Sequence, residues 1–197
     1  DLALYSFSSS TTKSKNKMVK KNKAVFLDRD GVLVKSFVKN KKAYAPTKLK
    51  DFKIFKYSSS CIKKLNSHGF KTIVVTNQPD IDSKKLSKKT LKKMHYKLKK
   101  ETNVKSIYSC HHSSQKNCKC RKPRTGMLIK AAKVNKIDFN KSYMVGDRYS
   151  DIVCGNSIGC KTIFIDRNYG EKKPKTQITS VKNLNEATKY ILKNETR

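Results

Sequence analysis

The sequence has few acidic residues, few arginines and no long apolar run. Its 197 residues include 14 Asp and Glu against 47 Lys and Arg, a formal net charge of +33. No stretch approaches about eighteen consecutive apolar residues, so no membrane-spanning helix and no membrane association are expected. Only 7 Gly and 4 Pro are present, and neither a collagen-like chain nor a coiled coil fits this composition.

The positive charge comes almost entirely from Lys, which argues against a nucleic-acid groove. Only six residues are Arg, and the Lys residues are spread evenly along the chain. Surfaces that read phosphates and bases favour Arg, because its guanidinium forms two parallel hydrogen bonds. We therefore expect no nucleic-acid partner, although the positive field would attract a small anionic substrate.

Short apolar runs alternate with segments of helical spacing. Residues 1–17 are rich in Ser, Thr and Lys, which predicts a disordered leader before a single domain over 18–195. Residues 35–53 are interpreted as a long basic loop. Strand and helix signals alternate elsewhere, which predicts an α/β fold: a Rossmann-like parallel sheet with helices on both faces and no large cap domain. The expected strands are 24–27, 72–75, 106–108, 143–145 and 161–165, and the expected helices are 58–68, 84–100, 125–136, 150–158 and 183–193.

Acidic residues follow two of the expected strands directly. Asp28 and Asp30 come after the first strand, and Asp147 and Asp151 come after the fourth. Ligands of open parallel sheets bind at the carboxyl ends of the strands, so we expect these acids at one edge. Clustered carboxylates repel one another unless a cation is present, and Mg²⁺ prefers oxygen ligands.

This arrangement suits phosphoryl transfer. A carboxylate can attack phosphorus and form an aspartyl-phosphate, while a second acid protonates the leaving oxygen and later activates water. Thr76, at the end of the second expected strand, offers a hydroxyl for phosphate oxygens. Lys122 or Arg121 would neutralise the charge of the transferring group.

A second group of metal-binding residue types lies between 110 and 120. Cys110-His111-His112 is followed after five residues by Cys118-Lys119-Cys120. Three thiolates and one imidazole make a closed tetrahedral site typical of structural zinc. The spacing alone does not choose between His111 and His112. We expect reduced cysteines, and therefore a cytoplasmic location, while His68 and His95 are given no specific role.

Four motifs, in this order, resemble those of the haloacid dehalogenase superfamily of phosphatases: FLDRDGV, VVTNQ, CRKP and MVGDRYSDI, over residues 24–151. The resemblance implies that Asp28 is the nucleophile and Asp30 the acid and base. It further implies that Asp28, Asp147 and the backbone carbonyl of Asp30 hold Mg²⁺, with Asp151 beside this shell. The residues expected to bind phosphate or substrate are Thr76, Asn77, Arg121 and Lys122.

The zinc loop 110–120, running directly into CRKP, is similar to that of a subgroup. The subgroup contains D-glycero-D-manno-heptose 1,7-bisphosphate phosphatases and bacterial histidinol-phosphate phosphatases. The resemblance implies that Cys110, His112, Cys118 and Cys120 bind zinc and that the loop positions Arg121 and Lys122. It also implies a compact cleft for a small phosphorylated metabolite, here a sugar phosphate, in an enzyme expected to be a monomer.

The substrate within this subgroup is less determined by the sequence. The short spacing between His112 and Cys118 resembles the histidinol-phosphate branch. Residues 126–128 and the basic loop 35–53 resemble the heptose branch, and Gln78-Pro79-Asp80 departs from both. Because two phosphates suit a Lys-rich cleft, the heptose bisphosphate is favoured, with loss of its 7-phosphate.

Two alternatives remain outside this subgroup. A polynucleotide 3′-phosphatase would explain the charge, but aromatic stacking residues are not concentrated near the motifs. A non-catalytic zinc module that binds nucleic acid would leave the four acids without a role.

Overall fold

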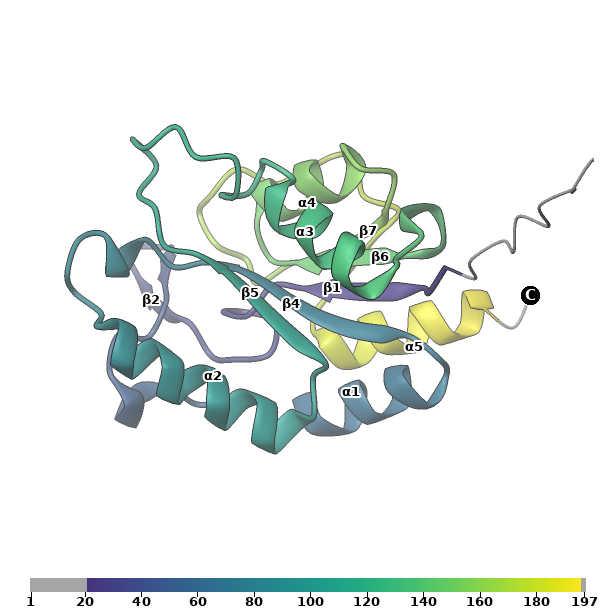
Figure 1. Cartoon of the computed structure of the whole chain (residues 1–197), viewed down its shortest axis with the longest axis horizontal. Helices are drawn as coiled ribbons and strands as arrows, with labels where there is room; N and C mark the ends of the chain where they lie inside the picture. Colours follow the sequence, from purple (N-terminus) through teal and green to yellow (C-terminus); the bar gives the residue numbers. More distant parts are fainter. Residues whose placement is uncertain (1–20, 196–197) are drawn as a thin grey trace, which may run out of the picture.

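The computed structural model describes residues 21–195; the predicted leader 1–17 lies outside this range. Six strands form one parallel sheet in the order β5-β4-β1-β6-β7-β8 (Figure 1). Every neighbouring pair is parallel, as predicted from the alternation of strands and helices. The strands are β1 (Ala24–Leu27), β4 (Lys71–Asn77), β5 (Ser106–Cys110), β6 (Tyr143–Gly146), β7 (Lys161–Ile165) and β8 (Thr179–Val181).

Helices cover both faces of the sheet, which confirms the predicted fold class. On one face lie α1 (Ser58–Ser67), α2 (Lys88–Thr102) and α5 (Leu184–Glu195), and on the other α3 (Gly126–Asn135) and α4 (Tyr149–Asn156) (Figure 1). Alternate residues of β1 enter the two cores: Val25 and Leu27 pack on the first face, Ala24 and Phe26 on the second. Because β1 is buried on both faces, it is a continuous apolar run rather than an alternating one.

The start of one helix and the number of strands in the parallel sheet differ from the sequence-based expectation. The helix expected from residue 84 begins at Lys88, because the Ser87 side chain caps it by accepting a hydrogen bond from the Thr90 amide at 3.0 Å. The parallel sheet also gains a sixth strand, β8, at its edge. Three short 3-10 helices complete the assignment: η1 (Leu49–Asp51), η2 (Pro79–Ile81) and η3 (Phe139–Lys141).

The expected basic loop contains a small hairpin, β2 (Phe37–Lys39) and β3 (Lys42–Tyr44). Arg148 ties it to the body of the protein by donating to the Ala43 carbonyl at 2.7 Å and to Glu171 at 2.6 Å. This hairpin is the only sheet besides the main one in residues 21–195. In the same range no helix is long and apolar enough to cross a membrane.

The register of the central strands brings the expected motifs to one edge. Leu27 of β1 pairs with Val74 of β4 and with Val145 of β6. The residues that follow these positions therefore lie side by side at the carboxyl ends of the strands. This edge is where an open parallel sheet places its ligand site.

Candidate active site

The centre of the site is an ion-pair cluster around a buried lysine. Lys122 is 3% exposed, and its ammonium lies 3.0 Å from an Asp28 carboxylate oxygen and 2.6 Å from an Asp151 oxygen. It also donates a 2.7 Å hydrogen bond to the Val75 carbonyl. A charge this deeply buried needs such partners, because its transfer from water is otherwise very unfavourable.

A third carboxylate completes the cluster but has no cation of its own. Ligand atoms of Asp28, Asp147 and Asp151 all lie within 4.8 Å of one another. Both carboxylate oxygens of Asp147 are buried, and in the described part of the chain they form no ion pair; the neighbouring polar group is the Tyr169 hydroxyl. Buried polar atoms are normally paired, so this donor set fits a hard divalent cation such as Mg²⁺.

The charge distribution shifts the titration of these groups. Burial, together with Asp28 and Asp151, raises the pKa of Asp147 well above its usual range. Burial raises the pKa of Asp151 to about 6, although Lys122 opposes the shift. Burial alone would lower the pKa of Lys122, but Asp151 and Asp28 outweigh it and raise that pKa. One ammonium does not balance three buried carboxylates, so protonation is favoured at Asp147 and Asp151 when no cation is bound.

Gly31 permits the close approach of Asp147 to the turn after β1. Its φ of +83° is a conformation that side-chain-bearing residues rarely adopt. A Cβ atom there would lie 1.8 Å from a carboxylate oxygen of Asp147. A residue with a side chain at this position would therefore displace the carboxylate.

The second acid of the first motif, Asp30, has different partners. Its carboxylate accepts hydrogen bonds from the Arg29 Nε at 3.1 Å and from the Gln78 Nε2 at 2.8 Å. Burial raises the pKa of Asp30, whereas Arg29 lowers it. Its side chain is not one of the three clustered carboxylates, which leaves its backbone carbonyl as the group to consider for the metal.

Asn77 holds the backbone of Lys122. Its amide donates to the Lys122 carbonyl and accepts from the Lys122 amide, both at 3.1 Å. The Thr76 hydroxyl is buried and accepts a hydrogen bond from Gln78 at 3.0 Å. Asn77 therefore contacts the lysine motif directly, a role that its residue type did not indicate.

A cavity of about 550 Å³ opens beside the cluster. Asp28, Asp30, Asn77, Arg121 and Lys122 line it, whereas Thr76 and Asp147 are buried and do not. Further basic side chains line it from the hairpin, from the segment before α2 and from the last motif. These are Lys42, Lys85 and Arg148.

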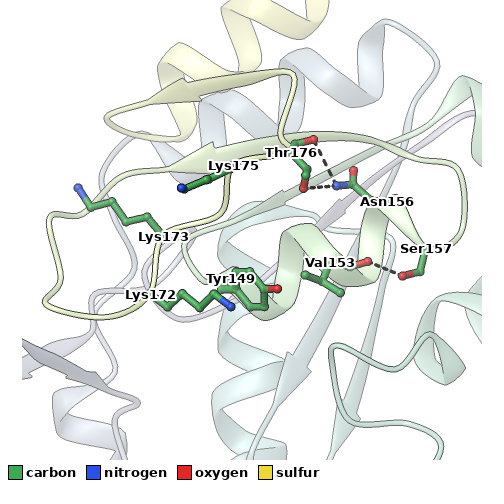
Figure 2. A pocket seen from close by; sticks show the side chains of 8 residues that line it. All are labelled: Tyr149, Val153, Asn156, Ser157, Lys172, Lys173, Lys175 and Thr176. Atoms are coloured by element: carbon green, nitrogen blue, oxygen red, sulfur yellow. Dashed lines mark hydrogen bonds between the residues drawn. The ribbon is translucent and has the colours of Figure 1, made fainter.

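A second cavity of similar volume lies between α4 and residues 172–176 (Figure 2). Its lining includes Tyr149, with the Lys172 ammonium 4.2 Å from the ring centre, and Asn156, which donates to Thr176. No acidic residue lines it. The chemistry of the side chains, rather than cavity size, identifies the first cavity as the candidate active site.

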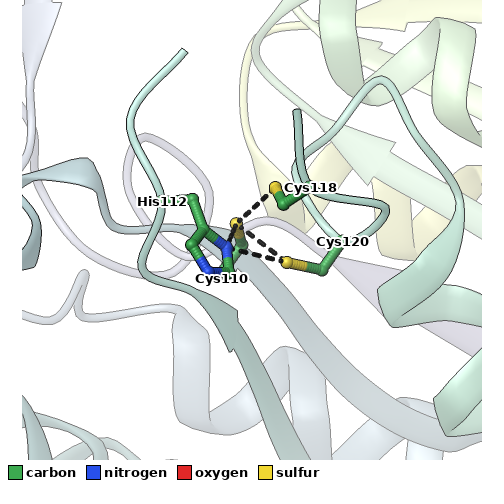
Figure 3. A group of neighbouring side chains, drawn as sticks. All are labelled: Cys110, His112, Cys118 and Cys120. Carbon is green, nitrogen blue, oxygen red and sulfur yellow. Dashed lines mark hydrogen bonds between the residues drawn. The ribbon is translucent and has the colours of Figure 1, made fainter. Parts of the chain in front are cut away.

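The cysteine–histidine cluster, formed by Cys110, His112, Cys118 and Cys120, gathers at the end of β5 (Figure 3). The Cys110 sulfur lies 3.7 Å from that of Cys118 and 3.2 Å from that of Cys120, and the His112 Nδ1 lies 3.2 Å from Cys120. Tetrahedral zinc with bonds of about 2.3 Å keeps its sulfur ligands about 3.8 Å apart. All cysteines are free thiols, so the donor set fits zinc.

The structure separates the two histidines that the spacing left open. The His112 Nδ1 faces the sulfur atoms, whereas the His111 Nε2 lies 2.9 Å from the Ser109 hydroxyl. The loop continues into Arg121, which donates to the His112 carbonyl at 3.2 Å. The cluster is thus joined to the residues that enter the cavity.

Sequence reasoning missed three residues around the acids: Arg29, Gln78 and His95. Arg29 and Gln78 hold Asp30, and the His95 ring lies 3.2 Å from the Arg29 guanidinium. Arg29 lies between two acids in the sequence and is one of only six arginines, and these two features could have marked it as a site residue. No pattern in the sequence distinguishes His95 from its neighbours on a Lys-rich helix.

Comparison with known proteins gives consistent matches. A model described as haloacid dehalogenase-like hydrolase matches residues 25–136, and a related one matches residues 119–194. A Helicobacter pylori D-glycero-beta-D-manno-heptose-1,7-bisphosphate 7-phosphatase is 31% identical over 180 residues, covering 88% of this chain and 99% of the relative. A Buchnera aphidicola histidine biosynthesis bifunctional protein is 34% identical over 158 residues, covering 78% of this chain and 42% of the relative.

The fold is also found in solved structures. A D,D-heptose 1,7-bisphosphate phosphatase from B. bronchiseptica, crystallised with magnesium and phosphate, superposes with a TM-score of 0.74. It is 22% identical, and the match covers 87% of this chain and 99% of that one. At this identity the match establishes a shared fold.

Proposed function

The chain belongs to the haloacid dehalogenase-like hydrolases, and on this premise we propose that it is a magnesium-dependent phosphatase, a phosphoric monoester hydrolase. Its favoured substrate is D-glycero-D-manno-heptose 1,7-bisphosphate, from which it removes the 7-phosphate. The observation that carries the proposal is the buried cluster of three carboxylates around Lys122, which opens onto a cavity with further basic side chains.

In the first step Asp28 acts as the nucleophile. One of its carboxylate oxygens attacks phosphorus, and the bond from phosphorus to the sugar oxygen breaks. Asp30 gives its proton to the departing sugar oxygen, so the sugar leaves as an alcohol. Lys122, 3.0 Å from Asp28, balances the charge that develops on the phosphoryl group. The product of this step is an aspartyl-phosphate.

In the second step Asp30 acts as the base. It takes a proton from a water molecule whose oxygen attacks the phosphorus of the aspartyl-phosphate. The bond between phosphorus and the Asp28 oxygen breaks, which releases phosphate and restores both carboxyl groups. Asp30 is protonated again and ready for the next substrate.

The metals have separate roles in this proposal. Asp28, Asp147 and the Asp30 carbonyl would hold Mg²⁺, which when bound offsets the negative charge of phosphate and carboxylates. Cys110, His112, Cys118 and Cys120 would hold zinc as a structural ion. The loop that they form would keep Arg121 and Lys122 at the cavity.

The charges that line the cavity favour a bisphosphate over histidinol phosphate. Lys42, Lys85 and Arg121 supply positive charge beyond that of Lys122, which suits a second phosphate. Histidinol phosphate carries an ammonium group and needs a carboxylate outside the catalytic cluster. Asp80 is the one such acid in the lining, which keeps histidinol phosphate as the second candidate, in line with the Buchnera relative.

The test measures phosphate release from a panel, first with Mg²⁺ and then with a chelator. The panel contains both heptose 1,7-bisphosphate anomers, histidinol phosphate, a 3′-phosphorylated oligonucleotide and an aryl phosphate. We expect the heptose bisphosphate to be turned over fastest, with activity lost in Asp28→Asn and kept in the exposed control Glu101→Gln. Asp80→Asn should leave heptose bisphosphate turnover unchanged and would reduce turnover of histidinol phosphate.

Other outcomes would overturn the proposal in defined ways. Fastest release from the oligonucleotide would identify a polynucleotide phosphatase. Retention of oligonucleotide at physiological salt without any phosphate release would identify a nucleic-acid-binding zinc module.

A further inference from the structure

Arg29 is a buried cation that pairs with Asp30, the proposed acid. Its side chain is fully buried, with the guanidinium carbon 5.3 Å from the centre of the Phe52 ring. The Nε lies 3.1 Å from both oxygens of Asp30, and an Nη lies 2.9 Å from one of them. Asp30 is therefore held by two nitrogens along one edge of a rigid planar group.

His95, on α2, contacts the far side of this guanidinium. Its Nε2 lies 3.2 Å from the other Nη of Arg29. Arginine has only hydrogen-bond donors, so the imidazole must accept with Nε2 and carry its proton on Nδ1. Burial and the Arg29 charge lower the pKa of His95 to about 3, which agrees with a neutral ring.

We propose that His95 is a positioning residue that holds Arg29, and through it Asp30, in the geometry needed for proton transfer. This inference rests on the proposed function, because it assigns a role to a residue that supports the proposed acid. It joins α2 to the first motif across 66 positions of the sequence.

Direct action on the substrate does not explain these contacts. Neither Arg29 nor His95 lines the cavity, and neither is among the clustered carboxylates and thiols that could hold a metal. Their side-chain hydrogen bonds lead instead from His95 to Arg29 and from Arg29 to Asp30.

Loss of the imidazole acceptor would affect Asp30 rather than the whole site. A buried guanidinium N–H without a partner is unfavourable, so Arg29 would turn toward another acceptor. Asp30 would then keep Gln78 as its remaining side-chain hydrogen-bond donor. The nucleophile Asp28 pairs with Lys122 and not with Arg29's side chain, so its attack should be preserved.

The experiment separates the two chemical steps. We would compare His95→Leu, which removes the acceptor, with His95→Gln, which keeps one near the same place. His68→Leu is the matched control, because His68 is an exposed histidine at the end of α1. An aryl phosphate needs no proton on its leaving group, so only its second step depends on Asp30.

For His95→Leu we expect aryl alcohol release in the first turnover to stay within about twofold, and steady-state turnover to fall about tenfold. The aspartyl-phosphate should accumulate. With the sugar phosphate, kcat should fall about tenfold and KM stay within about twofold. His95→Gln should recover most of this loss, and His68→Leu should match the wild type.

Several results would overturn the inference. Equal loss in both steps, an equal loss in His68→Leu, no loss in His95→Leu, or no recovery in His95→Gln would each do so. Nitrogen NMR of the wild type gives a reading that does not depend on the variants folding. A proton on the His95 Nε2 would contradict the contact. Absence of turnover in the wild type would instead overturn the proposed function, and this inference with it.

Discussion

The carboxylate centre and the cysteine–histidine cluster collect ligands in opposite ways. Asp28, Asp147 and Asp151 come from the ends of β1 and β6 and from the first turn of α4, and all are 8% exposed or less. The cysteine–histidine cluster takes its ligands from residues 110–120, and three of its four members are partly exposed. One centre therefore depends on the whole sheet, and the other on one loop.

This difference separates what each centre needs in order to form. The sheet brings the carboxylates together whether or not a cation is present, so without a cation their repulsion lowers the stability of the folded protein. The loop has little apolar packing of its own and depends on its ligand atoms to close. Metal removal should therefore loosen the loop but leave the carboxylate centre in place.

The largest effect is expected when the cation of the carboxylate centre is removed. In Lys122→Met, Asp28 and Asp151 lose their buried partner. We expect the free energy of unfolding to fall by about 3–5 kcal/mol and phosphatase activity to fall by at least about a thousandfold. Urea unfolding with a chelator and phosphate release with Mg²⁺ measure the two effects. The control is Lys130→Met on α3, and activity within tenfold of wild type would contradict the assignment.

Breaking the loop should reduce activity more than stability. Cys118→Ser removes one thiolate, so zinc content should fall and Arg121 and Lys122 lose their support. We expect activity to fall about tenfold and the melting temperature by no more than about 4 °C. Metal analysis, calorimetry and kinetics check this, with Ser114→Ala in the same loop as control. Full activity in zinc-free protein would show that the loop does not position the basic pair.

The carboxylate centre should gain stability when one of its charges is removed. The pKa of Asp147 is raised in the folded protein, so its charged form destabilises the fold as the pH rises above about 4. Without metal, Asp147→Asn should therefore be more stable than wild type by at least about 1 kcal/mol at pH 8. The difference should shrink toward pH 5. Urea unfolding at both pH values measures it, and a variant less stable at pH 8 would contradict the repulsion.

The smallest effect is expected at a surface contact that tethers the loop of the cysteine–histidine cluster to Asp82. Asp82 accepts from the Ser113 amide at 3.1 Å and pairs with Lys116 at 2.7 Å, and these bonds lower its pKa to about 2. Exposed ion pairs contribute little, so Asp82→Asn should change the melting temperature by about 1 °C or less. Calorimetry measures this change, and a loss comparable to that of Cys118→Ser would show that the tether, rather than zinc, closes the loop.

The fold was largely predictable because its core strands are buried on both faces and therefore form unbroken apolar runs. The hairpin was not, because its turn uses Asn40 and Lys41 at φ of 50° and 59° without the glycine that normally indicates such a turn. The three residues of β2 are all exposed, so no burial pattern reveals them. Edge strand β8 has three residues, too few for a period to be recognised.

The candidate site likewise contains residues that the sequence predicted and residues that it did not. Asp28, Asp147 and Lys122 follow strands or a recognisable motif, and the structure brings them together. The contact between His95 and Arg29 could not be predicted, because it depends on where α2 crosses the sheet rather than on local spacing. The place of Asp147 in the cluster was predictable, but its lack of an ion-pair partner was not, since that depends on which side chains the folded protein brings near it.

The strand order also determines when each centre can appear during synthesis. β1 lies in the middle of the sheet, with β6 as one neighbour. The carboxylate centre around Asp28 therefore cannot form until Asp147 and Asp151 have been synthesised. The thiols and imidazole of residues 110–120 are complete well before that point. A nascent chain could therefore hold zinc while it still lacks a working nucleophile. Bound zinc would be an early marker of synthesis, and phosphatase activity a late one.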